Sequence, residues 1–390
     1  MMERRTDRLL GRDLISVLVA QTCFGYSFSS FLLFPKFLAT ELGANAAQIG
    51  QVATANRFST MVGLLVGGVL VDRFGRRPFL RVGAVLMAVA SLSFFWVHEF
   101  GSLIFLLRAC QGLAFGMAFA AGSALVVDLA PPQKLAQAIG YFGMTMLSTN
   151  ALAPLSVEAL AVISGWRLAF AAAALGAVLC LLASFLIREP RHSRAEANQI
   201  SGLLQVALDP KQLRCACVIA IVGAAFATVF VLHQPFAVEL GIKQVSLFFV
   251  AYTAAALLVR LGAGPFVDRI GRSRVAVVSL FLYAVAVALT ADLANLGLIV
   301  LGGLLGLAHG FFYPSFNALA VEGASPHDRG KIMAVFQAWF TAGGAFGTFF
   351  LGALAYAEGY PMVFEVVGLA TFIALGILVV SPEGRAAFRR

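Results

Sequence analysis

Charged side chains are scarce in this sequence: Asp, Glu, Lys and Arg make up 12% of its 390 residues, whereas a soluble domain carries about 25%. A surface facing water needs more charge than this, which excludes an ordinary soluble domain. Hydrophobic residues reach 60%, and the mean hydropathy is +0.90. The composition therefore predicts an integral membrane protein.

Signatures of catalysis and of cofactor binding are also lacking. No phosphate-binding glycine loop with lysine, metal-ligand cluster or nucleophile elbow occurs in the sequence. The five cysteines are odd in number and match no zinc or disulfide spacing: Cys23, Cys110, Cys180, Cys215 and Cys217. We therefore expect no enzyme, no cofactor and no metal site, and an ion gradient rather than ATP as the energy source.

What the sequence does contain is twelve apolar runs, each about 20 residues or longer, the length that crosses a bilayer. They lie at about 14–37, 47–71, 79–98, 102–128, 136–163, 167–187, 215–239, 245–267, 275–293, 297–322, 331–356 and 360–381. The first run is too long for a signal peptide and has no cleavage site, so we expect no cleaved signal. The fold class predicted is all-α, with an N-terminal six-helix bundle (1–187), a cytoplasmic linker (188–214) and a C-terminal six-helix bundle (215–390).

Lys and Arg set the orientation of the predicted helices, because they concentrate in cytoplasmic loops. Of the 28 basic residues, 22 fall on one side of the twelve-helix topology. Both termini are then cytoplasmic, and the net charge of +9 records topology rather than nucleic-acid binding. We expect a multi-pass protein of the bacterial inner membrane.

The two halves repeat each other. GGVLVDRFGRR (Gly67–Arg77) has a counterpart in AGPFVDRIGRS (Ala263–Ser273), and the stretch Gly112–Pro132 aligns without gaps on Gly306–Pro326. Six spans return the chain to the same side, so equivalent helices run in the same direction. Repeats of this kind are typical of secondary transporters, which bind substrate near mid-membrane between the repeats.

The loop G-x-L-x-D-R-x-G-R-R (Gly68–Arg77) resembles the signature loop of the major facilitator superfamily, as does its weaker copy at Gly264–Arg272. Gly68 permits close helix approach and Gly75 a tight turn, while the arginines offer donors to carboxylates at helix ends. The resemblance implies a network that closes the cytoplasmic side; the alternative is that the arginines only set topology. The predicted cytoplasmic gate comprises Gly68, Asp72, Arg73, Gly75, Arg76, Arg77, Asp128, Asp268, Arg269, Gly271, Arg272 and Glu322.

The fourth helix carries LLRACQGLAFG (Leu106–Gly116), which is similar to the R-x-x-Q-G motif that the same family uses in proton coupling. Arg108 lies about 10 Å inside the outer surface, at 1.5 Å of rise per residue. A charge there is costly and is usually retained for function. Arg108 and Gln111 are therefore coupling candidates; a structural arginine paired with Glu158 is the alternative.

Further polar residues interrupt the apolar runs and are candidates for the substrate path. Arg57 and Arg260 occupy the same face of equivalent helices at different depths, since Thr253, the counterpart of Arg57, lies seven residues before Arg260. Few carboxylates oppose these cations, which favours an anionic solute. The remaining candidates are Gln21 and Lys36 on helix 1, which form a polar stripe with Gly25 and Ser29, then Glu158, Tyr141, Thr145, Ser148 and Asn150 on helix 5, His233 and Gln234 on helix 7, and His309, Tyr313 and Asn317 on helix 10.

These observations predict proton-coupled transport of a small organic solute by alternating access. Aromatic richness and the helix 4 motif favour efflux of an amphipathic compound. The cationic interior favours uptake or exchange of an organic anion instead, as does helix 5, where Ala153, Val157 and Glu158 replace the glycines of the drug exporters' G-P-x-x-G-G signature. A receptor-like membrane protein without transport is a third alternative. The expected partners are a small molecule, protons and membrane lipid, and we expect a monomer.

Overall fold

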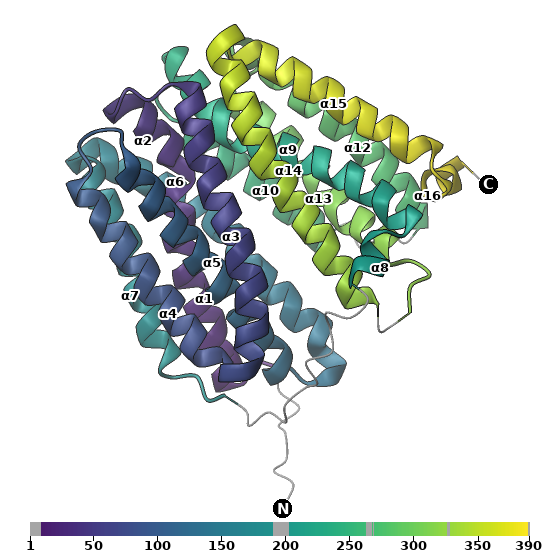
Figure 1. Cartoon of the computed structure of the whole chain (residues 1–390), viewed down its shortest axis with the longest axis horizontal. Helices are drawn as coiled ribbons and strands as arrows, with labels where there is room; N and C mark the ends of the chain where they lie inside the picture. The colour runs from purple at the N-terminus through teal and green to yellow at the C-terminus, as the bar shows by residue number, and fades with distance from the viewer. Residues whose placement is uncertain (1–8, 190–202, 263–266, 268, 326–327, 389–390) are drawn as a thin grey trace, which may run out of the picture. The chain divides into compact units, whose positions relative to one another are not determined.

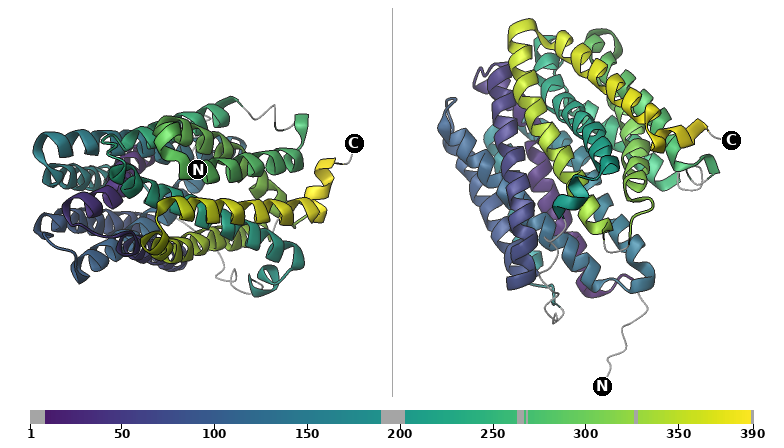
Figure 2. Two further views of the ribbon diagram at one scale, coloured as in Figure 1. Left: turned by 90° about the horizontal axis from the view of Figure 1, so that it is seen from above. Right: turned by 45° about the vertical axis from the view of Figure 1, so that its right-hand side comes forward.

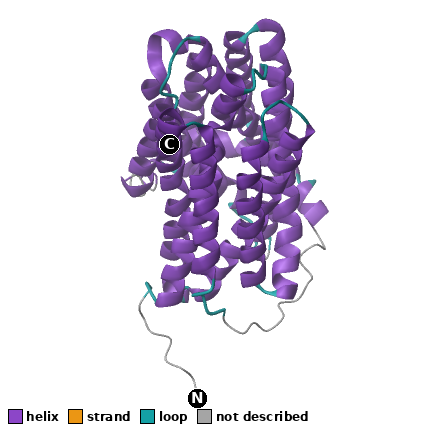
Figure 3. Cartoon of the chain, turned by 90° about the vertical axis from the view of Figure 1, so that its left-hand side faces the viewer, coloured by secondary structure: helices purple, strands orange, loops and turns teal. Residues whose placement is uncertain are grey.

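The computed structural model describes residues 9–189, 203–262, 267, 269–325 and 328–388, and every regular element in these ranges is a helix (Figure 3). The first elements are α1 (Arg12–Ser30), η1 (Phe31–Leu33), α2 (Phe34–Glu41), α3 (Ala46–Phe74), α4 (Arg76–Ser93), η2 (Phe94–Trp96), α5 (Ser102–Leu129), η3 (Pro132–Lys134), α6 (Leu135–Ser164) and α7 (Trp166–Ser184). The later ones are α8 (Leu203–Ala207), α9 (Pro210–Glu239), α10 (Ser246–Gly262), α12 (Arg272–Leu289), η4 (Thr290–Asp292), α13 (Leu293–Val321), α14 (Arg329–Glu358), α15 (Tyr360–Val380), α16 (Pro382–Arg385) and η5 (Ala386–Phe388).

Nine helical segments among the described residues are long and apolar enough to cross a membrane. One of them, Arg272–Val321, contains two predicted runs, because α12 and α13 follow each other through η4 and a kink at Gly297. The helix α10 is apolar but shorter, and α3 is 29 residues long but carries polar residues such as Asn56 and Arg57. The protein is therefore a multi-pass helical membrane protein, and the count of twelve spans is consistent with its helices.

The sequence repeat is also a repeat of backbone geometry. Gly75 and Gly271, which precede α4 and α12, both have φ +94°, in the left-handed region that favours glycine. Gly165 and Gly359, which precede α7 and α15, have φ +76° and +86°. Each half therefore makes the same two sharp turns at equivalent places in the chain.

The helices form two compact units (Figure 1). The first contains residues 1–34 and 58–195, and the second contains residues 35–57 and 196–390. This division groups residues 35–57, which belong to the predicted N-terminal bundle, with the second unit, and it falls within the predicted linker 188–214. The place of residues 35–57 in the second unit follows from contacts of the first part of α3 with α14.

In the first unit, α1 packs against α6 and α7, and α4 packs against α5 and α7. Phe24, Leu80, Met87 and Leu125 belong to its buried core. Small residues permit the closest approaches: a Cβ added at Gly63 would lie 2.8 Å from the carbonyl oxygen of Leu113 on α5. Close packing of this kind holds membrane helices together, since lipid tails are as apolar as their side chains.

In the second unit, α9 packs along α14, α10 along α13, and α12 against both α13 and α15 (Figure 2). Glycines again line the tightest pairs. A Cβ at Gly302 or Gly306 of α13 would collide with the carbonyl oxygens of Phe248 and Tyr252 on α10. The four-residue spacing of these glycines places them on one face of α13, so that the α10 backbone can lie directly against it.

Candidate functional site

The signature loop joins α3 to α4 in the first unit. Gly75 makes the turn, and Arg76, which is buried, follows it as the first residue of α4. The Nε atom of Arg76 lies 3.0 Å from an Oδ2 oxygen of Asp128, one residue before the end of α5. The structure thus brings together two of the predicted gate residues as a largely buried ion pair, which costs several kcal/mol to break by removing one partner.

Glu189 is a residue of this loop region that the sequence analysis missed. Its carboxylate accepts hydrogen bonds from the backbone N–H groups of Arg76 at 2.6 Å and of Arg77 at 3.3 Å. Those groups are unpaired donors at the N-terminus of α4, where the helix dipole also favours negative charge. The carboxylate therefore caps α4 and ties the segment after α7 to the signature loop. Its signal in the sequence was an acidic residue directly after the sixth apolar run.

Other predicted gate residues of the first unit have different surroundings. A Cβ added at Gly68 would meet no described atom within 4 Å. Close approaches of α3 to α5 are made by Gly63 and by Gly67, where an added Cβ would lie 3.3 Å from the Cα of Met117. The guanidinium of Arg73 lies 5.2 Å from the ring centroid of Phe74. The side chain of Asp72 lies outside the part of the chain that the structure describes.

We expect replacement of Glu189 by Ala to loosen the first turn of α4, because the loss of an N-terminal cap costs about 1 kcal/mol. Hydrogen–deuterium exchange should become faster at the amides of Arg76 and Arg77 and stay unchanged in the middle of α4. Glu99→Ala is the control, because Glu99 is an exposed acidic residue. Unchanged exchange at Arg76 and Arg77 would show that the carboxylate does not hold the turn.

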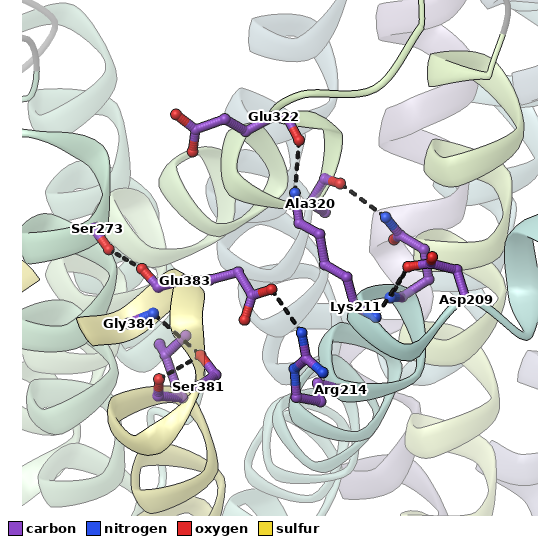
Figure 4. A network of polar contacts seen from close by, with 11 residues as sticks. Asp209, Lys211, Arg214, Ser273, Ala320, Glu322, Ser381, Glu383 and Gly384 are labelled. Carbon is purple, nitrogen blue, oxygen red and sulfur yellow. Dashed lines mark hydrogen bonds and ion pairs between the residues drawn. The ribbon is translucent and has the colours of Figure 1, made fainter. Parts of the chain in front are cut away.

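The second copy of the signature loop lies partly outside the described residues, and this includes Asp268. Arg269, Gly271 and Arg272 are exposed. Glu322 is also exposed, and its backbone carbonyl accepts a hydrogen bond of 2.6 Å from Lys211 (Figure 4). This copy therefore has no described counterpart of the Arg76–Asp128 pair.

A polar network instead surrounds the chain segment after α15 (Figure 4). Glu383 of α16, the positional counterpart of Glu189, forms an ion pair of 2.9 Å with Arg214 of α9. The hydroxyl of Ser273 donates to the backbone carbonyl of Glu383. Partial burial alone would raise the pKa of Glu383, but the hydrogen bond and charge of Arg214 outweigh it and lower that pKa below its ordinary value. The two halves thus use equivalent carboxylates for different contacts.

Arg108 lies on α5 and is buried. Its guanidinium lies 5.5 Å and 5.1 Å from the ring centroids of Phe31 and Phe34, and Nη1 donates to Oε1 of Gln111 at 2.7 Å. Gln111 in turn donates to the hydroxyl of Ser91 on α4 at 3.3 Å. The two residues of the R-x-x-Q-G motif are therefore joined directly, and aromatic faces stabilise the arginine charge by cation–π attraction.

The polar stripe predicted on helix 1 packs against α6. Gln21 donates to the sulfur of Met146 at 3.1 Å, and Ser29 donates to Oδ1 of Asn150 at 2.9 Å. Glu158, two turns beyond Asn150 on α6, is also buried. Tyr141, Thr145 and Ser148 are partly exposed on the same helix. The stripe residues therefore serve helix packing within the first unit, a contact that periodicity alone did not identify.

A seam of small residues joins the first part of α3 to α14 within the second unit. We call it the α3–α14 seam; it consists of Gly50, Thr54 and Arg57 facing Gly344, Ala345, Thr348 and Gly352. Thr54 donates to the backbone carbonyl of Ala345 at 2.9 Å, and its Oγ1 lies 3.1 Å from that of Thr348. A Cβ added at Gly352 would lie 3.0 Å from the Cα of Gly50.

Two of the predicted cations, Arg57 and Lys36, also make contacts within the second unit. Nη1 of Arg57 would lie 3.1 Å from a Cβ added at Gly344, so the guanidinium lies against the α14 backbone. Lys36 donates to the backbone carbonyl of Lys243 at 2.6 Å. Neither the seam glycines nor Thr54 were among the predicted site residues, although Gly344, Thr348 and Gly352 recur at the four-residue spacing of one helix face.

An aromatic cluster surrounds His309 in the second unit. We call it the His309 cluster; it consists of Phe226 (α9), Tyr252 (α10), Tyr283 (α12), His309 and Tyr313 (α13) and Phe340 (α14). The imidazole lies between Phe226 and Tyr313, with ring centroids at 4.8 Å and 5.3 Å and interplanar angles of 30° and 27°. Tyr252, Tyr283 and Phe340 have centroids 5.9–6.4 Å from it. Four members were missed by the sequence analysis, because they lie on four different helices.

One side of the His309 cluster is accessible. Phe226, Tyr313 and Phe340 are partly exposed, and the hydroxyl of Tyr313 donates to Oε1 of the exposed Gln337 at 2.6 Å. In the same cluster, Nδ1 of His309 and the hydroxyl of Tyr283 are buried without a hydrogen-bond partner. The cluster therefore combines partly exposed rings and an exposed amide with buried polar atoms that lack partners.

Arg260 sets the electrostatic character of this cluster. It is exposed on α10 and interacts electrostatically with Tyr252, His309 and Tyr313. A cation bound at these rings would be repelled by this guanidinium. That repulsion opposes the cation–π attraction of the rings, which is worth about 0.5–1 kcal/mol at an exposed site.

Three remaining candidates lie in the second unit. His233 is wholly buried on α9, where Nδ1 donates to the carbonyl of Val229 at 2.6 Å and the ring lies 4.1 Å from that of Phe248. Gln234, also buried, donates to the carbonyl of Phe230. Asn317 is partly exposed, with a buried Oδ1. His233 and Gln234 thus pack between helices in this structure and line no described pocket.

The described residues contain no group of His, Cys, Asp and Glu that could hold a metal ion. All five cysteines are described, and each has a free thiol. A pocket of about 400 Å³ adjoins Asp209, Lys211 and Glu322. The candidate site itself consists of aromatic rings, amides and arginines.

Two repeated helical units, apolar spans and a buried ion pair at a glycine turn define a multi-pass membrane protein of the transporter class. The model of the Major Facilitator Superfamily matches residues 15–243 and 214–389, and the chain belongs to this family.

Curated relatives match part of the chain. The quinolone resistance protein NorA of Staphylococcus aureus (strain MRSA252) is 26% identical over 212 residues, which cover 53% of this chain and 54% of NorA. The purine ribonucleoside efflux pump NepI of Shigella dysenteriae serotype 1 (strain Sd197) is 32% identical over 145 residues, which cover 37% of this chain and 36% of NepI. The chain thus spans about half or less of the length of these relatives.

Solved structures show the same fold over nearly the whole chain. A peptide transporter POT structure has a TM-score of 0.80 at 14% identity and covers 95% of each chain. A structure of the nucleoside transporter NupG has a TM-score of 0.77 at 14% identity and covers 96% of this chain and 98% of that one. Identity this low shows the fold and leaves the substrate open.

Proposed function

We propose that the protein is a secondary active transporter of the bacterial inner membrane that exports an amphipathic organic solute in exchange for protons. The observation that carries the proposal is the accessible aromatic side of the His309 cluster. Aromatic faces beside the amide of Gln337 suit a solute with one apolar and one polar part. Binding by rings and amides is reversible, as repeated cycles of transport require.

The relatives support export. NorA is named for resistance to quinolones and NepI for efflux of purine ribonucleosides. Both kinds of compound contain a planar ring system, which the faces of Phe226, Tyr313 and Phe340 suit. The protein would act as a monomer, with both termini in the cytoplasm.

Alternating access needs one gate at each side of the membrane. The Arg76–Asp128 pair lies at the loop that the basic residues assign to the cytoplasm, and it would stabilise one closed state. The α3–α14 seam lies at the opposite end of α3 and would close the outer side. Arg108 and Gln111 would couple transport to protons, and Glu158, which is buried on α6, would be an acidic partner in this coupling.

Uptake or exchange of an organic anion is the second candidate. Arg57, Arg108 and Arg260 favour it, because each is a cation within a helix that has few acidic residues. Against it, the guanidinium of Arg108 already contacts Gln111, Phe31 and Phe34. Its charge is therefore less available to a substrate than the sequence predicted, and export of an amphipathic compound is favoured.

Flux in reconstituted vesicles tests the proposal. With the full chain in proteoliposomes, an imposed pH gradient should drive an amphipathic heteroaromatic dye several-fold faster than in protein-free vesicles, and a protonophore should abolish the difference. Arg108→Ala should remove the gradient-driven flux, whereas Arg167→Ala, at an exposed position of α7, should not. Absence of flux for every amphiphile and organic anion tested would refute coupled transport, and normal flux in Arg108→Ala would remove Arg108 from coupling.

A further inference from the structure

We infer that the His309 cluster selects planar aromatic solutes that are neutral or anionic and rejects organic cations. This inference rests on the proposed function, because it specifies the solute that the proposed transporter would carry. Its basis is the placement of acidic and basic residues around the rings.

The rings supply recognition of a planar solute. Phe226 stacks on His309, and Phe340 lies 5.7 Å from Phe226 and 5.5 Å from Tyr313, measured between ring centroids. These three rings are the partly exposed members, so an incoming ring system meets a connected aromatic surface. Stacking and edge-to-face contacts with such a surface add to simple burial.

Aromatic surfaces also attract cations, so the charged residues nearby decide whether cationic or anionic solutes are preferred. In α9, α10, α12, α13 and α14, which supply or line the cluster, the only acidic residues are Glu239 and Glu358, each the last residue of its helix. Glu239 is thirteen residues from Phe226 and Glu358 is eighteen from Phe340. At 1.5 Å per residue these separations are about 20 Å and 27 Å, beyond the screening length of about 8 Å in physiological salt.

The described charge that does reach the rings is positive. Arg260 interacts electrostatically with Tyr252, His309 and Tyr313, and no Asp or Glu does so among the described residues. A solute with a carboxylate would gain from this guanidinium, and a neutral one would be unaffected by it. A cationic solute would meet no described carboxylate as a counter-ion there, and it would be repelled by Arg260.

The buried polar atoms of the cluster favour a heterocycle over a hydrocarbon. Nδ1 of His309 and the hydroxyl of Tyr283 lack hydrogen-bond partners. Buried polar atoms without partners are costly. A ring nitrogen or exocyclic oxygen of the solute that reaches them, directly or through one water, removes that cost.

Equilibrium binding to the purified full chain in lipid nanodiscs tests the selectivity. The probes share one tricyclic ring system and differ in charge: acridone, acridine-9-carboxylate and N-methylacridinium. We expect the neutral and anionic probes to bind at least about tenfold more tightly than the cation. Equal or tighter binding of the cation would overturn the inference.

Two variants assign the effect to residues. Arg260→Gln should raise affinity for the cation and lower it for the carboxylate, each about tenfold, and leave acridone unchanged. Phe340→Leu, which keeps an apolar side chain without a ring, should weaken all three probes; Phe281→Leu, at an exposed ring outside the cluster, should weaken none. An unchanged ratio of cation affinity to anion affinity in Arg260→Gln would refute the role of Arg260. This measurement does not depend on Phe340→Leu, so it remains a test if that variant fails to fold.

Binding and flux separate this inference from the proposed function. Selective binding without gradient-driven flux in vesicles would refute coupled transport and support the selectivity. Gradient-driven flux of N-methylacridinium at the rate of acridone would support transport and overturn the selectivity.

Discussion

Oxidation of a Thr54→Cys, Thr348→Cys variant is expected to abolish transport, and reductant is expected to restore it. The two hydroxyl oxygens lie 3.1 Å apart across the α3–α14 seam, so the sulfur atoms of cysteines at these positions can approach each other. If this seam closes the outer side, it must separate once in every transport cycle. A covalent bond across it holds the protein in one state, and the expected loss is nearly complete.

The measurement is gradient-driven flux in proteoliposomes before and after oxidation. Each single-cysteine variant is a control, because the chain has five free cysteines of its own that oxidation also reaches. Electrophoresis after cleavage between the two positions reports whether the cross-link has formed. Full flux in a completely cross-linked sample would mean that the seam stays closed throughout transport and is packing rather than a gate.

Substitution of Gly343 by Ala is expected to give the largest loss of stability of any single methyl group added to α14. Its Cβ would collide with the backbone carbonyl oxygen of Ala220 on α9, and backbone cannot move aside as a flexible side chain can. Overpacking of this kind costs about 1–3 kcal/mol. The apparent melting temperature of the purified protein should fall by several degrees, with less protein recovered from the membrane.

Gly376→Ala is the matched control, since the same methyl group on α15 would meet no atom within 4 Å. Alanine is also the better helix former, so this variant should be as stable as the parent or slightly more so. If Gly343→Ala and Gly376→Ala both have the melting temperature of the parent protein, α9 and α14 are packed less closely than the structure shows.

Part of the candidate site was predictable from the sequence because its signal is local. The glycine turns at Gly75 and Gly271 follow from a motif in which a sharp turn joins two helices. The choice of Asp128 as a partner for the signature loop followed from its position at the end of a neighbouring helix, and it lies 3.0 Å from Arg76. Whether the pair opens during transport stays a prediction.

Other parts depend on which helices are neighbours and how each is rotated. Glu189 caps α4 although 113 residues separate it from Arg76. Gln21 and Ser29, predicted as a stripe on the substrate path, bond to α6. The His309 cluster draws its rings from α9, α10, α12, α13 and α14, and the sequence identified only the two rings on α13, those of His309 and Tyr313.

The sequence by itself determined that this protein spans a membrane, that its chain repeats, and where most of its helices lie to within a few residues. These properties follow from hydropathy and turn residues, which act over a few positions along the chain. Only the tertiary structure decided which face of each helix meets which neighbour, and therefore where the His309 cluster, the Glu189 cap and the α3–α14 seam form. In lipid, apolar residues suit every side of a helix, so no hydrophobic stripe marks the packed face; close contact of small residues and a few buried hydrogen bonds select it instead.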